Sequence, residues 1–478
     1  MSPEEREVLR HLALKKDRIF VVVRRKFAFF SCLKGLKKPN DVALVALLPE
    51  MNRSTISEYV ENCFDLIVYY DQNNNRFFDV DSYDDIRIPD KDTFGDELVE
   101  VVGDKSKIEL LLTEETSIKE VVRLGERLGV KCVRPEDMAR LNKKDLMIKA
   151  VKKHDIPTAK SLIINLLESY LMIKAVKKHN IPTAKSLTIN LLESCAPEQV
   201  LHTIKDVIGS YPLFIRPTNM ADCNGTATIA DENEMKEWLT RNSGKDQTCL
   251  IEEYLKGREF VAVVCLLEDG TFEPLVARYL EFGWSNVLHI KTGYPLLIRI
   301  DTFENVEHEL PNLQEFVSSV VHALDPPRPH IFTIQGFQRK PRTDDYVFVE
   351  CSYRPAGTRV NSVCYKICNV CQETALLMCH FDPKYRPIVQ KKKTNDEIYL
   401  WFPCREGLLE EHTQLPGKEN ISSKITANWL KPLGSRLAKA TVINHQMLYL
   451  TLQNDDQVRL LEDARWIAEH WRPKLTSL

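Results

Sequence analysis

The feature that most constrains the fold is an alternation of short apolar runs with amphipathic stretches in the first third of the chain. Four runs rich in branched aliphatic residues occupy residues 18–23 (RIFVVV), 41–48 (DVALVALL), 65–70 (DLIVYY) and 107–113 (KIELLLT). Such runs predict strands that are buried on both faces. Residues 117–130 (SIKEVVRLGERLGV) have the spacing of an amphipathic helix. We therefore predict an open α/β sheet. We expect no dinucleotide site in it, because VVVRRKF replaces a glycine-rich turn after the first run.

Length and charge narrow the class of protein further. A chain of 478 residues is too long for one core, so about three domains are expected. Its net charge of −3 gives no broad basic field, and we expect neither nucleic acid nor a membrane as a partner. The first residues lack the apolar core of a secretory signal, and no run approaches the roughly 18 apolar residues of a membrane-spanning helix. A soluble, cytoplasmic protein is the expectation.

The cysteines predict reduced thiols. There are 13 of them, an odd number spread from Cys32 to Cys404, which fits a disulfide framework poorly. Cys364, Cys368 and Cys371 lie close together in CYKICNVC, but a zinc site needs four ligands and the sequence has no second pair with suitable spacing. We interpret the motif as a buried helix with small apolar thiols, and a zinc site is the alternative.

Residues 146–195 contain an internal repeat. LMIKAVKKHDIPTAKSLIINLLESY is followed directly by LMIKAVKKHNIPTAKSLTINLLESC, so two 25-residue copies differ at three positions. Two copies do not build a solenoid, which needs at least three units. We infer a recent duplication of one helix–Pro–strand unit, in which one copy is either an insertion or an artefact of the gene sequence. The lysines of the first copy (Lys149, Lys152 and Lys153) are expected on a solvated helix face.

Longer strands with charged ends follow from residue 205 onward. They are predicted at residues 211–217 (YPLFIRP), 248–255 (TCLIEEYL), 259–267 (EFVAVVCLL) and 346–353 (YVFVECSY). A charge placed beside a buried strand is costly unless something uses it. These strand ends are therefore the candidate positions for a functional site.

The charged motifs occur in an order that is typical of one superfamily. NKKDLM (142–147) precedes an amphipathic helix and an Ile-Pro pair, FIRP (214–217) ends a strand, and LIEEYLKGREF (250–260) and VECSYRPAG (349–357) follow. In this order the motifs resemble those of the ATP-grasp superfamily. Its enzymes join a carboxylate to an amine or a thiol through an acyl-phosphate, and the closest resemblance is to the carnosine-synthase-like and other amino-acid ligases.

The resemblance implies the domain organisation. Residues 1–140 correspond to the α/β domain that usually precedes the ATP-grasp fold, and residues 141–395 correspond to the fold itself, with two α+β subdomains. Residues 157–248, which include most of the duplication, are expected to form its lid. Residues 396–478 are interpreted as a small α+β cap with one early strand (IYLWFP) and a final helix (DDQVRLLEDARWIAEHW).

The resemblance also assigns nucleotide-binding residues. They are Lys144, Arg216, Gly225, Glu252, Glu253, Leu255 and Glu259. Lys144 and Arg216 supply the cations for the phosphates. Arg216 stands where relatives usually have lysine, but an arginine keeps the positive charge and can bind two phosphate oxygens at once. Glu252 resembles the acceptor of the adenine amine, and Glu259 resembles the acid that bonds the ribose hydroxyls. Glu253 and Leu255 offer backbone groups to the adenine ring. Gly225 belongs to a loop (MADCNG) that is expected to cover the phosphates.

The last motif is implied to hold the metal and the reacting groups. Glu350 resembles the carboxylate that bridges magnesium, and Arg354 resembles the arginine that steadies the transferring phosphate or the substrate carboxylate. Magnesium takes oxygen ligands, usually one or two carboxylates plus phosphate oxygens. Ser352 stands where the family has asparagine. On the preceding strand (FTIQGF), the candidates for the partner ligand are Gln335 and Phe332, and if Phe332 is the equivalent residue that ligand is absent.

The function implied by the resemblance is an ATP-dependent carboxylate–amine ligase with small-molecule substrates, which uses ATP with Mg²⁺ or Mn²⁺. The alternative is an ATP-binding protein of the same fold that has lost catalysis, and a scaffold that binds no nucleotide is a third hypothesis. Phe282 and Trp284 are candidates either for the substrate pocket or for the core, whereas His289 and His330 are expected to be structural or exposed. Relatives are often dimers, so a homodimer is compatible with this interpretation.

Overall fold

A computed structural model describes residues 1–24, 33–54, 56–71, 91–114, 117–158, 187–190, 197–218, 225–245, 247–281, 283–390, 396–443 and 445–477. Much of the duplication and Phe282 lie outside these ranges, so the predictions made for them are not tested.

The N-terminal sheet is parallel, with the strand order β3-β2-β1-β4. All four predicted strands form, and the side chains of the inner strands β1 and β2 are covered on both faces, whereas the edge strand β3 is fully covered on one face only. In a parallel sheet the carboxyl ends of the strands meet at one edge, so Arg24 after β1 and Glu114 after β4 lie at the same edge. The elements are α1 (Pro3–Lys15), β1 (Arg18–Val23), β2 (Val42–Pro49), α2 (Glu58–Glu61), β3 (Leu66–Tyr70), α3 (Lys91–Val102), β4 (Ile108–Leu111) and α4 (Ile118–Leu128).

The central sheet has eight strands in the order β13-β12-β9-β10-β11-β14-β18-β16, and its paired strands are antiparallel. Its last three strands come from the C-terminal residues, so the predicted C-terminal strand continues this sheet rather than starting a separate one. The strands are β9 (Arg258–Leu266), β10 (Phe272–Leu280), β11 (Leu296–Asp301), β12 (His330–Gln338), β13 (Tyr346–Ser352), β14 (Glu397–Pro403), β16 (Lys424–Trp429) and β18 (Gln446–Gln453). The predicted final helix is α15 (Gln457–His470), and β15 (Gly407–Leu409) pairs with β17 (Ser435–Leu437).

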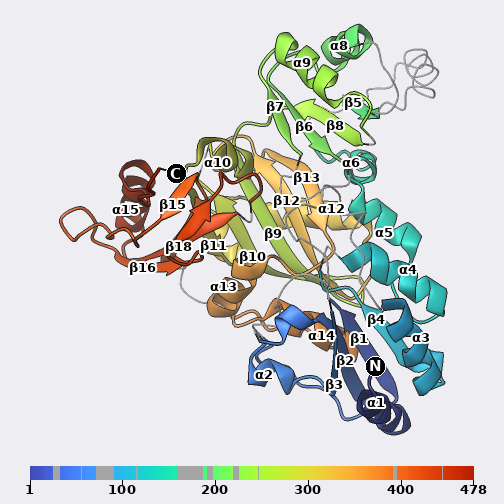
Figure 1. Cartoon of the computed structure of the whole chain (residues 1–478). Helices are drawn as coiled ribbons and strands as arrows, with labels where there is room; N and C mark the ends of the chain where they lie inside the picture. Colours follow the sequence, from blue (N-terminus) through green and yellow to red (C-terminus); the bar gives the residue numbers. More distant parts are fainter. Residues whose placement is uncertain are drawn as a thin grey trace.

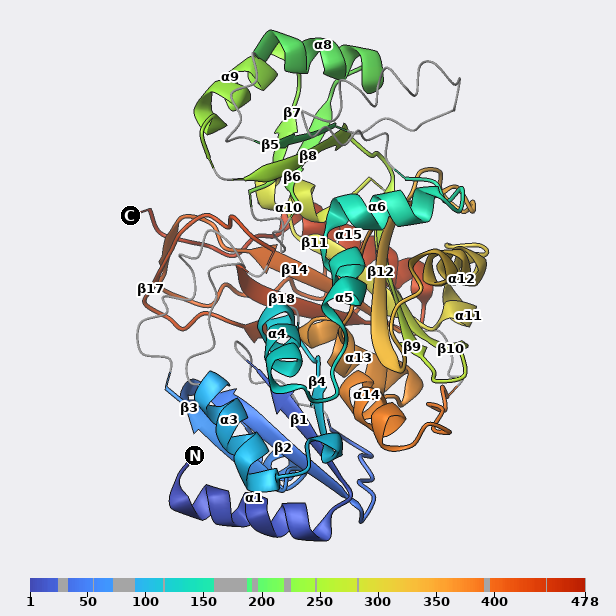
Figure 2. The same ribbon diagram turned by 90° about the vertical axis from the view of Figure 1, so that its right-hand side faces the viewer.

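A third sheet has the order β5-β8-β6-β7, and we call it the lid sheet because it is formed by residues of the predicted lid and its border (Leu187–Glu253). It lies at one end of the molecule and the N-terminal sheet lies at the other, with the central sheet between them (Figures 1 and 2). Its elements are β5 (Leu187–Asn190), α8 (Pro197–Val207), β6 (Leu213–Pro217), β7 (Ala227–Ile229), α9 (Glu232–Asn242) and β8 (Thr248–Glu253). The mixed α/β and α+β fold class predicted from the sequence is confirmed.

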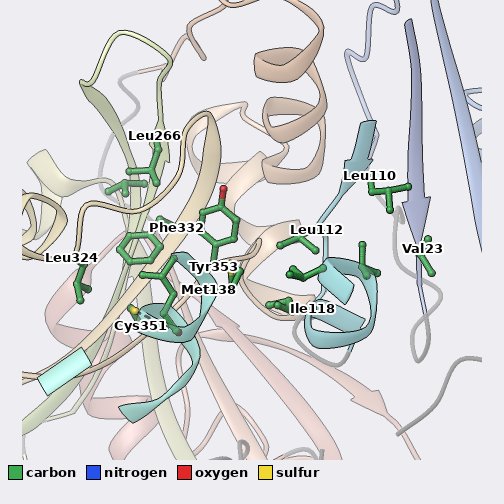
Figure 3. Close-up of a cluster of buried hydrophobic side chains, with 14 of the residues drawn as sticks. Val23, Leu110, Leu112, Ile118, Met138, Leu266, Leu324, Phe332, Cys351 and Tyr353 are labelled. Atoms are coloured by element: carbon green, nitrogen blue, oxygen red, sulfur yellow. Dashed lines mark hydrogen bonds between the residues drawn. The ribbon is translucent and has the colours of Figure 1, made fainter. Parts of the chain in front are cut away.

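One hydrophobic core joins the N-terminal sheet to the central sheet. Figure 3 shows Val23 and Leu110 of the N-terminal sheet in the same cluster as Phe332 and Tyr353. Along the chain, α5 (Pro135–Asn142) and α6 (Lys144–Lys152) follow the N-terminal sheet. Apolar residues of both helices belong to this cluster. The N-terminal sheet is therefore held rigidly against the central sheet, and its carboxyl edge can contribute to a shared site.

The remaining helices include α10 (Asn286–Thr292), α11 (Phe303–Val306), α12 (Leu313–Leu324), α13 (Thr358–Cys368) and α14 (Gln372–Phe381). Cys364 and Cys368 lie buried on α13, with Cys371 buried just before α14, and all three are free thiols, as the interpretation of a buried helix expected. Within the described ranges, no group of three or more His, Cys, Asp or Glu side chains is arranged to hold a metal ion. None of the helices described is long and apolar enough to span a membrane.

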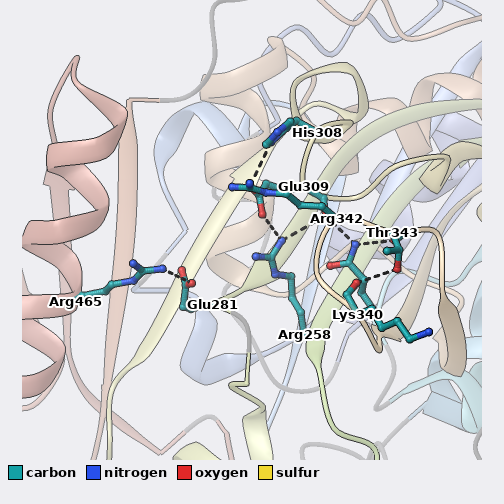
Figure 4. A network of polar contacts seen from close by, with 9 residues as sticks. Arg258, Glu281, His308, Glu309, Lys340, Arg342, Thr343 and Arg465 are labelled. Atoms are coloured by element: carbon teal, nitrogen blue, oxygen red, sulfur yellow. Dashed lines mark hydrogen bonds and ion pairs between the residues drawn. The ribbon is translucent and has the colours of Figure 1, made fainter.

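A polar network fixes the start of β9 to the hairpin between β12 and β13 (Figure 4). Glu309 accepts from Arg258 at 2.7 Å and from Arg342 at 3.1 Å, and Gln338 Nε2 donates to the Glu309 carbonyl at 2.8 Å. Arg465 of α15 pairs with Glu281 at 2.6 Å, which ties the last helix to the end of β10. The start of β9 and the end of β10 are thus each held by an ion pair.

We expect that Gly257→Ala destabilises the protein strongly, because Gly257 occupies the turn between β8 and β9. Its φ is +137°, and a Cβ there would lie 2.2 Å from the backbone oxygen of Gln338. The cost should exceed about 2 kcal/mol in urea unfolding. Gly270→Ala is the matched control, since its φ is +89° and nothing lies within 4 Å of the added Cβ. Equal losses in the two variants would show that the close approach at Gly257 does not matter.

Candidate functional site

Arg216 connects the lid sheet to the central sheet. It lies on β6, and its Nε and Nη2 atoms donate to the two oxygens of Glu252 on β8 at 2.6 Å and 3.1 Å. Its Nη1 atom donates to Glu350 on β13 at 3.2 Å, and Nη2 also donates to the Val349 carbonyl at 3.2 Å. The side chains of Arg216 and Glu252 are only 6% and 5% exposed, so this bridge is desolvated. A planar guanidinium can make such a fork, whereas a lysine ammonium cannot.

Glu350 has a second cationic partner in Lys144. Lys144 begins α6, and its Nζ atom lies 3.4 Å from Glu350 Oε2. Burial of the Glu350 carboxyl raises its pKa, but the charges of Lys144 and Arg216, with a smaller contribution from Arg354, outweigh this and lower the pKa below its usual value. Glu350 is therefore ionised at neutral pH. Three segments that are far apart in the sequence thus meet at one carboxylate.

The register of β12 and β13 decides which residue neighbours Glu350. Gln335 is paired directly with Glu350, and Thr333 is paired with Ser352, so these side chains share one face of the sheet. Phe332 is fully buried and contributes to the core in Figure 3. Of the two alternatives open in the sequence, Gln335 is the one that lies beside Glu350.

Glu259 lies next to Gln335 on the same face. It is on β9, and its carboxylate accepts from Gln335 Nε2 at 2.6 Å and from the backbone N–H of Asn286 at 2.9 Å, as well as from the Asn286 amide. Burial raises the pKa of Glu259, and the nearby Arg278 partly offsets this effect. Arg278 Nη2 donates to Asn286 Oδ1 at 3.1 Å, so the first residue of α10 connects the cation to the acid. Neither Arg278 nor Asn286 was identified from the sequence.

Of the remaining predicted nucleotide residues, Glu252 and Glu253 end β8, Leu255 lies in the turn after it, and Gly225 precedes β7. Glu253 and Leu255 are half-buried, and both carboxylate oxygens of Glu252 face Arg216. Gly225 is exposed and follows residues 219–224, which lie outside the described ranges, so its closure over phosphates stays a prediction.

The lysines of the first repeat copy do not all lie in solvent. Lys149 and Lys153 are exposed as predicted, but Lys152 is half-buried. Burial lowers the pKa of Lys152 to about 8, and the charge of Glu252 opposes this shift. Lys152 therefore lies near the acid end of β8, where the sequence interpretation placed only solvent.

The oxygen atoms near Glu350 fit one magnesium ion. Glu350 offers a carboxylate and Ser352 a hydroxyl. Since the Gln335 amide nitrogen donates to Glu259, the Gln335 carbonyl oxygen is the atom that can face a metal. Magnesium is usually held by one or two carboxylates together with substrate phosphates. One anionic protein ligand is enough under that rule, provided that a nucleotide supplies the rest.

The two histidines are structural, as expected. His289 is 1% exposed, lies against the Tyr294 carbonyl through Nδ1, and accepts from Gln446 Nε2 at 3.0 Å through Nε2. His330 is equally buried and stacks on Tyr353 with the ring centroids 3.7 Å apart. Burial lowers the pKa of His289 to about 4 and that of His330 to about 3, so both are neutral. Trp284 packs between two hydrophobic clusters, which favours its core interpretation.

We expect His289 to make stability depend on pH. Its pKa falls from 6.5 in the unfolded chain to about 4 in the folded one, so the unfolded state binds more protons between these values. Stability is therefore full above pH 6.5 and is lost as the pH falls, by about 2 kcal/mol between about pH 8 and about pH 5. Urea unfolding of the wild type and of His289→Gln measures this, and the variant should lose that part of the slope. Identical slopes would contradict it.

Three further buried charged residues were missed in the sequence, and one of them, Arg24, interacts electrostatically with the other two and with Arg354. Arg24 is 4% exposed, Glu114 is 5% exposed and Glu373 is 6% exposed. Arg24 directly follows β1, and Glu114 directly follows the apolar run 107–113 that contains β4, so the argument that singled out Glu350 could have found them. Glu373 lies in the first turn of α14 and had no comparable pattern.

Comparison with known proteins agrees with this arrangement. The family described as the D-ala D-ala ligase C-terminus matches residues 175–294, the segment that contains Arg216, Glu252 and Glu259. A D-alanine–D-alanine ligase from Acetivibrio thermocellus is 40% identical over 84 residues, which are 15% of this chain and 22% of that ligase. The match thus spans about a fifth of the length of this curated relative.

Solved structures match nearly the whole chain in fold. An L-amino acid ligase from Bacillus licheniformis has a TM-score of 0.55 at 11% identity, covering 94% of this chain and 97% of that one. The biotin carboxylase domain of the 2-oxoglutarate carboxylase from Hydrogenobacter thermophilus, solved as a dimer with MgADP, ADP and bicarbonate, has a TM-score of 0.54 at 12% identity, covering 91% and 86%. Residues 175–294 thus carry the D-ala D-ala ligase C-terminal signature, and the chain as a whole has the fold of the ATP-grasp ligases, as its motifs predicted.

Proposed function

We propose that the protein is an ATP-dependent carboxylate–amine ligase that acts through an acyl-phosphate. The observation that carries this proposal is the meeting of Arg216, Lys144 and Glu350 between the lid sheet and the central sheet. Two cations directed at one carboxylate are suited to polyphosphate, because phosphate oxygens can take over the cations when the nucleotide binds.

The chemistry requires positioning more than covalent assistance. The oxygen of a substrate carboxylate forms a bond to the γ-phosphorus of ATP while the bond from that phosphorus to ADP breaks. The amine nitrogen then attacks the acyl carbon, the bond from that carbon to the phosphate oxygen breaks, and the amine proton leaves with phosphate or solvent. Lys144, Arg216 and Arg354 stabilise the negative charge on the transferring group, which accounts for a site without a nucleophile–histidine pair.

The proposal also assigns the residues that would hold the metal ion and the nucleotide. Glu350, Gln335 and Ser352 would hold a magnesium ion, which would supply additional positive charge on the phosphates, and manganese is the alternative. Glu252, Glu253, Leu255 and Glu259 would contact the adenosine, and Gly225 the phosphates.

We further propose that residues 1–140, 141–395 and 396–478 form three domains and that the lid lies in residues 157–248. The substrates are proposed to be a small-molecule carboxylic acid and a small-molecule amine. We also propose that the protein acts in the cytoplasm and that it forms a homodimer.

A titration of ATP with and without magnesium, followed by phosphate release over a panel of acids and amines, tests the proposal. Phosphate released only with a particular acid and amine establishes the ligase. The second candidate is an ATP-binding protein without turnover, which the neutral Gln335 beside Glu350 favours. Tight ATP binding without phosphate release in any mixture would select it, and the absence of ATP binding would overturn both.

A further inference from the structure

The hydrogen bonds of Arg216 engage every nitrogen atom of its guanidinium. Nε and Nη2 donate to the two oxygens of Glu252 at 2.6 Å and 3.1 Å. Nη1 donates to Glu350 at 3.2 Å, and Nη2 also donates to the Val349 carbonyl at 3.2 Å. A phosphate that binds a guanidinium through two parallel hydrogen bonds needs Nη2 as one of its donors. Such a phosphate therefore has to displace at least one of these protein acceptors.

The register of the lid sheet explains why Arg216 reaches outside that sheet. In the pairing of β6 with β8, Arg216 lies opposite Leu250, which is two residues from Glu252 on the same strand. Arg216 and Glu252 therefore share one face as diagonal neighbours. The opposite face carries Ile215 and Ile251, which pack with α8 and α9. The face of Arg216 is the one turned toward β13, which lies below the lid sheet in Figure 1.

The lid sheet has a hydrophobic core of its own. Its buried apolar side chains form one cluster, and among the described residues every member of that cluster lies between positions 200 and 251. This cluster does not extend into the central sheet, so its packing does not hold the two sheets together. Polar contacts across the gap have to do so, and those of Arg216 are strong because its side chain is only 6% exposed.

We propose that Arg216 is an autoinhibitory latch, which holds the lid sheet on β13 and has to release Glu252 and Glu350 before ATP can bind. The latch occupies the guanidinium that is proposed for the phosphates. It also occupies both oxygens of Glu252, which is proposed to contact the adenosine. The latched arrangement and bound ATP thus exclude each other. A lysine would keep the charge but could not form the fork.

This inference rests on the nucleotide-binding part of the proposed function and specifies how the entry of ATP is regulated. The test follows the binding of a fluorescent ATP analogue to the full chain by stopped flow, without magnesium and at increasing analogue concentration. In the wild type the observed rate should reach a plateau, because release of the latch precedes binding. Arg216→Lys should raise that plateau at least about 10-fold, since it loses the fork and keeps a cation for the phosphates.

Arg258→Lys is the matched control. The Arg258 side chain is also 6% exposed and donates to a carboxylate, that of Glu309, at 2.7 Å, but this pair lies outside the site. Its plateau should equal that of the wild type. A wild-type rate that rises linearly over the whole concentration range overturns the latch, and so do equal plateaus in the wild type and Arg216→Lys.

A second variant keeps the test decisive if Arg216→Lys does not fold. Glu350→Gln removes the charge of the acceptor on β13, so it should also raise the plateau, and an unchanged plateau overturns the latch. If the analogue binds to neither the wild type nor Arg216→Lys, the nucleotide site and the latch both fail, whereas binding to Arg216→Lys alone supports the latch. Phosphate release is not measured here, so failure of the ligase proposal leaves this result intact.

Discussion

Glu350→Gln is expected to reduce phosphate release by at least about 10³-fold while ATP binding measured without magnesium changes little or tightens. The carboxylate lies 3.4 Å from Lys144 and 3.2 Å from Arg216, so its loss removes an anionic partner from each of these two cations. It also removes the only carboxylate among the three proposed metal ligands. ATP itself loses an unfavourable negative neighbour, which explains why binding should survive. Single-turnover phosphate release and an ATP titration measure the two effects separately.

The matched control is Glu309→Gln. Glu309 is 23% exposed and Glu350 is 29% exposed, and each pairs with two cations, but Glu309 belongs to the network of Figure 4, outside the site. This variant should keep phosphate release even if it lowers stability. Unchanged phosphate release in Glu350→Gln would remove Glu350 from the reaction and support a protein that binds ATP without turnover.

Arg216→Met is expected to lower both stability and affinity for ATP. The change leaves Glu252, whose side chain is 5% exposed, buried opposite an apolar side chain, and breaking a buried pair in this way costs about 3–5 kcal/mol. The affinity for ATP should fall by about 10- to 100-fold, because the phosphates lose a charged hydrogen-bond donor. Urea unfolding measures the first effect and an ATP titration the second.

The double variant Arg216→Met/Glu252→Leu separates the two roles. Without either charge, most of the lost stability should return, whereas the affinity for ATP should stay low. If the single variant is as stable as the wild type, water must reach Glu252 and the bridge is not desolvated. If the double variant binds ATP normally, the phosphates do not depend on Arg216.

Local patterns predicted the elements well. The four apolar runs of the first third form β1 to β4, because short runs of branched aliphatic residues favour strands whose apolar side chains pack into a core. The final helix and the strands that contain Arg216 and Glu350 were also predicted, since each pattern depends only on the residues within it. The order of the charged motifs, together with the resemblance, placed Lys144, Arg216 and Glu350 in one site.

The sequence by itself thus determined the four strands of the N-terminal sheet, several later strands, the final helix and which strands carry charge near their ends, because periodicity is a local property. Only the tertiary structure decided which charges meet. Arg216 and Glu350 are 134 residues apart and touch because the lid sheet approaches the central sheet, and Gln335 rather than Phe332 neighbours Glu350 because of the register of β12 and β13. Glu373 acts electrostatically on Arg24 because α14 packs against the N-terminal sheet in one core. Such contacts depend on packing between sheets, and no pattern along the chain encodes that packing.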